Sequence, residues 1–185
     1  MKKSYWIWGI VAIVVLWGIV SYNGLVRTNA GVDNQWAQVE AQYQRRFDLI
    51  PNLVSSVKGI LKQEQAVFGE IAEARTRYSG ATTVSDKVAA ANQVESALGR
   101  LLVITENYPQ LKSSDTVQTL MAQLEGTENR ISVERMRFND NVTAMNVKVQ
   151  GFPSSIIAKI FGFGPRELFK AAEGAATAPK VDLTQ

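Results

Sequence analysis

The sequence predicts an all-α protein, with one N-terminal transmembrane helix followed by an antiparallel, up-and-down helical bundle whose long first helix is kinked. Three observations predict this class. Residues 4–26 form an apolar stretch without a charge, and later apolar residues recur at alternating spacings of three and four. No segment alternates apolar and polar residues for long enough to make a strand. A chain of 185 residues has room for one such domain and an anchor.

The uncharged stretch is long enough to cross a lipid bilayer. At about 1.5 Å per residue, roughly 20 helical residues cross a hydrocarbon core of about 30 Å. Aromatic residues lie near both of its ends, as in the aromatic belts of membrane proteins: Tyr5, Trp6, Trp8, Trp17 and Tyr22. A cleaved signal peptide is the main alternative, but its apolar region is shorter and ends in a small-residue cleavage site. Because residues 22–27 have no such pattern, we expect a retained anchor over residues 1–26.

Charges at the two ends of the anchor predict its orientation. Lys2 and Lys3 precede it, whereas Arg27 and then Asp33 follow it. The positive-inside rule therefore favours a cytoplasmic N-terminus and an extracytoplasmic bundle. We expect a single-pass protein of the bacterial cytoplasmic (inner) membrane.

The bundle is predicted over residues 27–152, beginning with one long helical stretch. The positions of its 4-3 repeat are Val32, Trp36, Val39, Tyr43, Arg46, Ile50, Leu53, Val57, Ile60, Glu64, Val67, Ile71, Ala74 and Tyr78. Pro51 interrupts this pattern, since it removes a helical hydrogen bond and its ring clashes with the preceding turn. We expect a kink near residues 47–50, and a sharp kink would divide the stretch into two helices.

Two further helices follow a loop after Gly80. Ser85 is the expected N-cap of the second helix, which ends at Tyr108-Pro109. Its repeat positions are Val88, Ala91, Glu95, Leu98, Leu102 and Thr105. The third helix ends at Gly151 and Pro153, and its positions are Val117, Met121, Leu124, Glu128, Ile131, Arg135, Phe138, Val142, Met145, Val149 and Phe152.

Five repeat positions carry a charge: Arg46, Glu64, Glu95, Glu128 and Arg135. One interpretation places these side chains at the margin of the core, with their charged ends in water. The other is a partly buried ion-pair network of Glu64, Glu95, Glu128 and Arg135 that fixes helix register, with Arg135 bridging Glu64 and Glu95.

Composition argues against most enzyme chemistries and against nucleic-acid binding. The chain has no cysteine and no histidine, which excludes thiolate metal sites, cysteine nucleophiles and histidine bases. The three glutamates of the network lack the histidines of di-metal bundle sites. Setting aside Lys2 and Lys3 leaves 18 of the 20 basic residues against 17 acidic ones, and no basic run forms a phosphate-binding groove. We expect a protein that is not an enzyme and has no cofactor, no metal and no nucleic-acid partner.

The sequence resembles the LemA family. The similarity is carried by blocks in family order at residues 22–26, 32–36, 45–54, 97–102, 106–112, 127–131, 138–140, 152–153 and 161–163, among them Arg45-Arg46-Phe47-Asp48-Leu49-Ile50-Pro51-Asn52-Leu53. The resemblance implies a membrane anchor and a helical bundle, with a poorly defined role and no catalytic residues. Relatives in magnetosome-forming bacteria are tied to organelle membranes, which implies scaffolding. Glu134, Phe138 and Asn141 depart from the expected Ala, Tyr and Ala.

Polar positions within these blocks form a candidate register or partner surface: Arg45, Arg46, Asp48, Asn52, Asn129, Arg130, Asn139 and Asp140. One interpretation gives them capping, register and inter-helix hydrogen bonds. The alternative is a surface that docks a partner beside Pro51.

The C-terminal region divides into an apolar segment and a tail. Residues 153–173 are too short and too broken by glycines to span a bilayer. We expect this segment to pack on the bundle, on a neighbouring subunit or in the membrane interface. Residues 174–185 are predicted to be a flexible tail.

These features predict a membrane-anchored, non-catalytic scaffold or adaptor. Trp36, Val39 and Tyr43 lie below the region that the shorter second helix can cover, so they predict an uncovered stripe and a homo-oligomer. The alternatives are an accessory subunit of a membrane enzyme such as a protease, and an enzyme that uses carboxylates alone. The expected partners are the lipid bilayer, further copies of the chain and another membrane protein.

Overall fold

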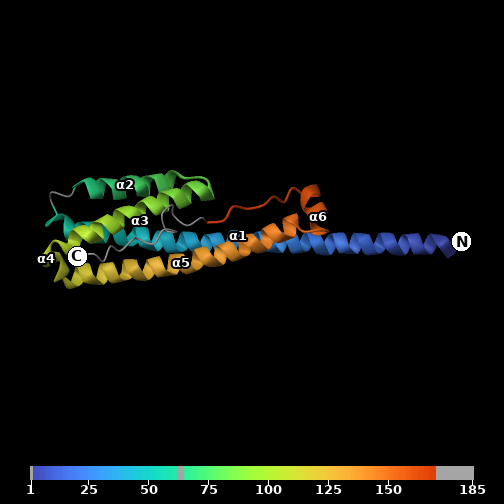
Figure 1. Ribbon diagram of the computed structural model, residues 1–185, viewed down its shortest axis with the longest axis horizontal. Coiled ribbons are helices and arrows are strands. Elements are labelled where there is room, and N and C mark those ends of the chain that lie inside the picture. Colours follow the sequence, from blue (N-terminus) through green and yellow to red (C-terminus); the bar gives the residue numbers. More distant parts are fainter. Residues whose placement is uncertain (1, 62–64, 170–185) are drawn as a thin grey trace, which may run out of the picture. The chain divides into compact units, whose positions relative to one another are not determined.

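The computed structural model describes residues 2–61 and 65–169, and all the regular secondary structure in these ranges is helical (Figure 1). The helices are α1 (Lys2–Lys58), α2 (Gln65–Gly80), α3 (Val84–Glu106), α4 (Pro109–Lys112), α5 (Asp115–Gln150) and α6 (Ser154–Ile160). The predicted all-α class is confirmed.

The long first stretch is two helices, but Pro51 does not separate them. α1 continues through Pro51 to Lys58, and the chain leaves the helix at Gly59. The stretch is therefore divided after Lys58 and not at the proline, and a milder kink near residues 47–50 stays a prediction.

The chain forms two compact units, and α1 and α5 contribute residues to both. The first unit contains Met1–Ala41 and Ile131–Leu168, and the second is built around Gln42–Arg130.

The first unit pairs the N-terminal part of α1 with the C-terminal part of α5. The rings of Trp36 and Phe138 lie edge to face with their centroids 5.7 Å apart, and Gln35 donates a hydrogen bond to Glu134. Lys148, further along α5, reaches back to Thr28, which precedes Gln35, so the two helices run antiparallel. The core residues are Leu25, Val32, Val39, Ile131, Phe138, Val142, Met145, Val149 and Ala158.

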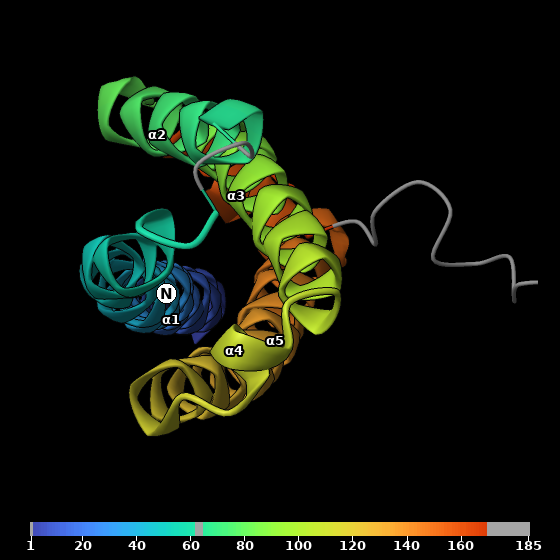
Figure 2. The same ribbon diagram turned by 90° about the vertical axis from the view of Figure 1, so that its left-hand side faces the viewer.

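The second unit packs the C-terminal part of α1 with α2, α3, α4 and the start of α5 (Figure 2). α3 begins at its N-cap Thr83, whose hydroxyl accepts a hydrogen bond from the Asp86 backbone N–H at 3.1 Å. Its core includes Ile50, Leu53, Val57, Leu61, Ile71, Ala91, Val94, Leu101, Leu111 and Val117.

Small residues set the register of α3, which differs from the predicted one. Its buried positions are Ala90, Ala91, Val94, Ala97, Leu101 and Thr105, whereas Leu102 is 47% exposed and Glu95 is exposed. The predicted repeat follows the larger side chains of this helix. In the structure, alanines lie on the inner face and let α3 pack closely. Ile60 and Phe152 were also expected in the core and are 40% and 84% exposed, because both follow the end of their helix.

Candidate functional site

The N-terminal part of α1 is apolar on every side and almost uncovered. Every residue from Tyr5 to Leu16 is exposed, including Trp6 at 78% and Trp8 at 70%. This is the one helix among the described residues that is long and apolar enough to cross a membrane. A helix that is apolar all round needs an apolar surrounding on all sides, which a one-sided protein groove does not provide.

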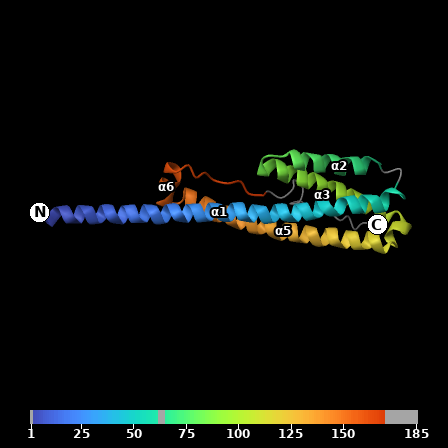
Figure 3. The same ribbon diagram turned by 180° about the vertical axis from the view of Figure 1, so that it is seen from behind.

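The C-terminal segment covers the end of this apolar stretch. A side chain at Gly18 would have its Cβ 3.8 Å from Cδ1 of Ile157 in α6. Tyr22 contacts two phenylalanines that follow α6, with ring centroids 4.6 Å from Phe161 and 6.0 Å from Phe163. Of the three alternatives for this segment, the described part packs on its own chain (Figure 3).

Hydrogen bonds fix the segment beyond α6. The Asn146 side chain binds the Arg166 backbone in both directions, accepting from the N–H at 2.8 Å and donating to the carbonyl at 2.9 Å. The Arg166 guanidinium donates to Asn29 at 2.9 Å and lies 3.2 Å from the Asp33 carboxylate. These contacts begin just past the uncharged stretch. Residues 170–173 of the predicted segment and the predicted tail 174–185 lie outside the described residues.

A buried ion pair lies inside the second unit. Arg46 of α1 is 2% exposed and pairs with Glu128 of α5, whose side chain is 38% exposed. Beside Arg46 in the sequence, Tyr43 and Phe47 pack on Tyr78 of α2, with ring centroids 5.5 Å and 4.6 Å away. The buried guanidinium is thus paired with a carboxylate that is partly exposed to solvent.

One member of the predicted ion-pair network, Glu128, has an ion pair in the structure, and its partner lies outside that network. Glu128 has its ion pair with Arg46, which the sequence placed in the seam but not in this network. Glu95 is exposed, which agrees with the interpretation that places these side chains at the margin of the core. Glu64 lies outside the described residues. Arg135 is half-buried in the first unit, and the bridge from it to Glu64 and Glu95 stays a prediction.

The predicted register or partner surface is divided between the units. Arg45, Asp48, Asn52, Asn129 and Arg130 are exposed in the second unit, while Asp140 is exposed and Asn139 half-buried in the first. Asp48 accepts a hydrogen bond from Gln44 at 2.8 Å, and the Asn52 carbonyl accepts from Ser55 and Ser56.

The expected self-association stripe is not uncovered. Val39 and Tyr43 are fully buried, and Trp36 is half-buried against Phe138. The expectation considered cover from the second helix alone. In the structure α5 covers Trp36, and Tyr78 of α2 lies against Tyr43.

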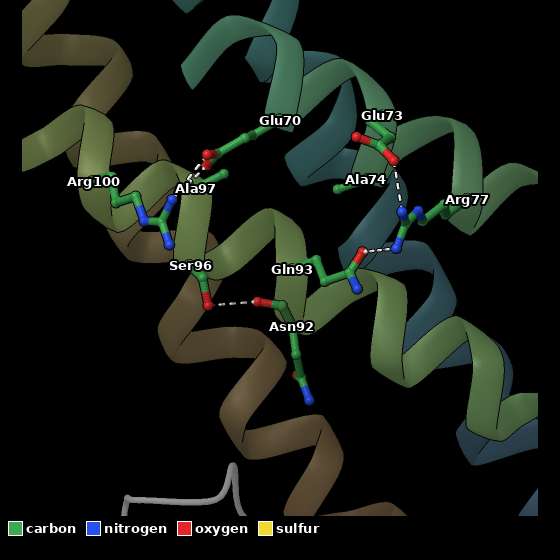
Figure 4. A pocket seen from close by; sticks show the side chains of 9 residues that line it. All are labelled: Glu70, Glu73, Ala74, Arg77, Asn92, Gln93, Ser96, Ala97 and Arg100. Atoms are coloured by element: carbon green, nitrogen blue, oxygen red, sulfur yellow. Dashed lines mark hydrogen bonds and ion pairs between the residues drawn. The ribbon is translucent and has the colours of Figure 1, made fainter. Parts of the chain in front are cut away.

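Sequence reasoning missed a polar depression of about 370 Å³ between α2 and α3 (Figure 4). Arg100 pairs with Glu70 at 2.9 Å across the two helices, and Arg77 lies 2.6 Å from Glu73 and 3.3 Å from Gln93. The charges at its rim thus neutralise one another. Within the described ranges no group of three or more histidine, cysteine, aspartate or glutamate residues could hold a metal ion.

Comparisons with known proteins place the chain in a family. Magnetosome protein MamQ of Magnetospirillum gryphiswaldense is 26% identical, and the match covers 82% of this chain and 65% of that protein. Magnetosome protein MamQ 2 of Paramagnetospirillum magneticum is 25% identical with the same coverage of both chains. Protein LemA of Metamycoplasma hominis is 23% identical, and the match covers 82% of this chain and 69% of that protein. The chain thus spans just under two thirds of the length of the magnetosome relatives.

The family model agrees with the resemblance that the sequence blocks carry. The model of the LemA family matches residues 35–183, which is most of the chain. This chain therefore belongs to the LemA family.

Proposed function

We propose that this protein is a membrane-anchored, non-catalytic scaffold or adaptor of the bacterial cell envelope. The observation that carries the proposal is the apolar helix surface from Tyr5 to Leu16, which is exposed on all sides. Water would order around this surface at a large free-energy cost, whereas a bilayer accepts it without loss.

The proposal includes a location and an orientation. The uncharged stretch would cross the cytoplasmic membrane once, with Lys2 and Lys3 on the cytoplasmic side and the second unit outside. The names of the magnetosome relatives refer to a cellular structure and to no reaction, which supports an organising role. Self-association through Trp36, Val39 and Tyr43 is not carried into the proposal, because that stripe is covered.

Membrane extraction of the full chain tests the anchor. The variant Ile10→Arg/Val14→Arg places two charges in the middle of the apolar helix, each costing about 2.5–3.5 kcal/mol in a bilayer. Unmodified protein should stay with the membrane pellet in high salt and alkaline carbonate, and the variant should move to the supernatant. Val103→Arg is the matched control, because Val103 is 63% exposed in α3, close to the 58% of Val14.

Recovery of the unmodified chain in the supernatant would contradict the anchor, as would equal retention of the double-arginine variant. Purification in mild detergent separates the two roles. A scaffold or adaptor is expected to purify without a fixed amount of any enzyme. A protease or other enzyme that co-purifies at stoichiometric yield would favour the accessory-subunit alternative.

A further inference from the structure

We infer that α6 and its flanking phenylalanines form a foot that binds the headgroup region of anionic lipids. The inference rests on the proposed membrane anchor. Four side chains make up the lipid-facing surface of this foot: Phe152 at 84% exposure, Ile156 at 48%, Ile160 at 67% and Phe161 at 56%. Large apolar side chains gathered in this way on one short segment mark an interaction surface.

α6 has two distinct faces. Ala158 is fully buried and Ile157 packs towards Gly18 of α1, so this face holds α6 to the protein. Ile156 and Ile160 are four residues apart and share the other face, where they are 48% and 67% exposed. This apolar face is therefore available to an occupant outside the described residues.

The position of α6 along α1 favours lipid as that occupant. α6 contacts α1 at Gly18, and Phe161 contacts Tyr22, at the level where the aromatic residues Trp17 and Tyr22 mark the end of the uncharged stretch. α6 has seven residues, about 10 Å of helix, and lies across the side of α1 (Figures 1 and 3). A short helix across a membrane-spanning one lies in the plane of the interface, where its apolar face can enter the acyl boundary. The foot thus continues the apolar surface of the span.

The positive charge of the side chains near α6 favours lipids with anionic headgroups. No acidic residue occurs in residues 2–32 or 141–166, so the segments that meet at this level carry cations alone. Arg27 and Lys159 are exposed there, and Lys148 is exposed while donating to the Gly24 carbonyl and the Thr28 hydroxyl. Cations beside a membrane surface attract anionic lipids.

A single fluorescent probe on the full chain in vesicles tests the foot. Because the sequence has no cysteine, Ile160→Cys carries one thiol for an environment-sensitive label. The quencher is a lipid with a doxyl group high on its acyl chain. Val14→Cys reports the anchor, and Val103→Cys, at similar exposure in α3, reports a position away from lipid. Vesicles contain phosphatidylcholine alone or with phosphatidylglycerol.

We expect quenching at Val14 in both kinds of vesicle, none at Val103, and quenching at Ile160 that increases with phosphatidylglycerol. Lys159→Gln should lower the ratio of quenched to unquenched Ile160 probe about five-fold in anionic vesicles, since each such cation contributes about 1 kcal/mol. Lys112→Gln, which removes an exposed cation in α4, should leave this ratio unchanged.

Three results would overturn the inference while the anchor stands. In each, the Val14 probe is quenched. The first is an Ile160 probe that behaves like the one at Val103, and the second is quenching at Ile160 that ignores lipid charge. The third is an Ile160 probe shielded from lipid until the protein is diluted in the bilayer, which would assign the face to a second copy. Absence of quenching at Val14 would instead overturn the proposed anchor, and the foot with it.

Discussion

The two ends of α1 use apolar side chains in opposite ways. From Tyr5 to Leu16 every residue is exposed and nearly all are apolar, whereas from Val32 to Val57 burial recurs every third or fourth residue. One helix therefore passes from a part that suits a uniform apolar solvent to a part that suits a core on one side and water on the other. The comparison shows that the distribution of apolar residues around the helix, more than their number, distinguishes the two surroundings.

Matched leucine truncations should separate the two parts most strongly. Leu53 is 1% exposed and Leu16 is 63% exposed, and both lie in α1. Leu53→Ala should lower the free energy of unfolding by about 2–5 kcal/mol, because it leaves a cavity in the core. Leu16→Ala should leave it nearly unchanged. Denaturant unfolding of the full chain in detergent measures both, and equal losses would contradict the distinction.

The buried arginine gives the next largest effect, since Arg46 lies in the bundle part of α1, where Glu128 of α5 is its partner. Glu128→Ala should cost about 2–3 kcal/mol in unfolding free energy, below the 3–5 kcal/mol typical of a fully buried pair because Glu128 is 38% exposed. Replacing both residues, Arg46→Met with Glu128→Leu, should recover most of the loss. A double variant less stable than Glu128→Ala would show that the pair itself stabilises the fold.

Two glycines of α5 and its end should respond to alanine with opposite signs. A Cβ at Gly151 would lie 2.7 Å from the Val147 carbonyl oxygen, so Gly151→Ala should destabilise the first unit by about 1–3 kcal/mol. Gly126 lies inside α5, and a Cβ there would meet open space. Gly126→Ala should therefore raise the free energy of unfolding by about 0.5–1 kcal/mol. Shifts of the same sign in thermal unfolding would contradict this assignment.

The surface pair between α2 and α3 should have the smallest effect. Arg100 and Glu70 are 64% and 44% exposed, so a double-mutant cycle with alanine should give a coupling of about 0–1 kcal/mol that disappears in high salt. A larger coupling that persists in high salt would mean that the two side chains beside the depression in Figure 4 are held more rigidly than exposed side chains usually are.

The helices could be predicted from sequence where large side chains define their inner face. The repeats of α1 and α5 are mostly buried as predicted, from Val32 to Val57 and from Val117 to Val149. In α3, Ala91 and Thr105 are buried as predicted, but the positions between them were predicted one residue late, because half of the inner face is alanine. Its N-cap is Thr83 and not Ser85, since either hydroxyl suits a cap and the geometry decides.

The site was less predictable because its contacts join distant parts of the chain. Arg46 and Glu128 are both conspicuous in the repeat, but their pairing depends on how α1 and α5 align. The binding of Arg166 to Asn146 and Asn29 requires the path of the segment after α6, for which no periodic pattern exists. The apolar helix at the N-terminus needed no such alignment, because length and composition identify it as a candidate membrane span.

Thiol accessibility along α1 tests most directly that one helix spans lipid and then enters the bundle. Val14→Cys and Gln38→Cys are both exposed positions of α1 in a chain without cysteine. In vesicles whose bilayer is intact but whose two faces are both made accessible to reagent by freezing and thawing, a water-soluble maleimide should label Gln38→Cys rapidly, and Val14→Cys only after a denaturing detergent is added. Equal labelling of the two thiols before detergent would contradict the account.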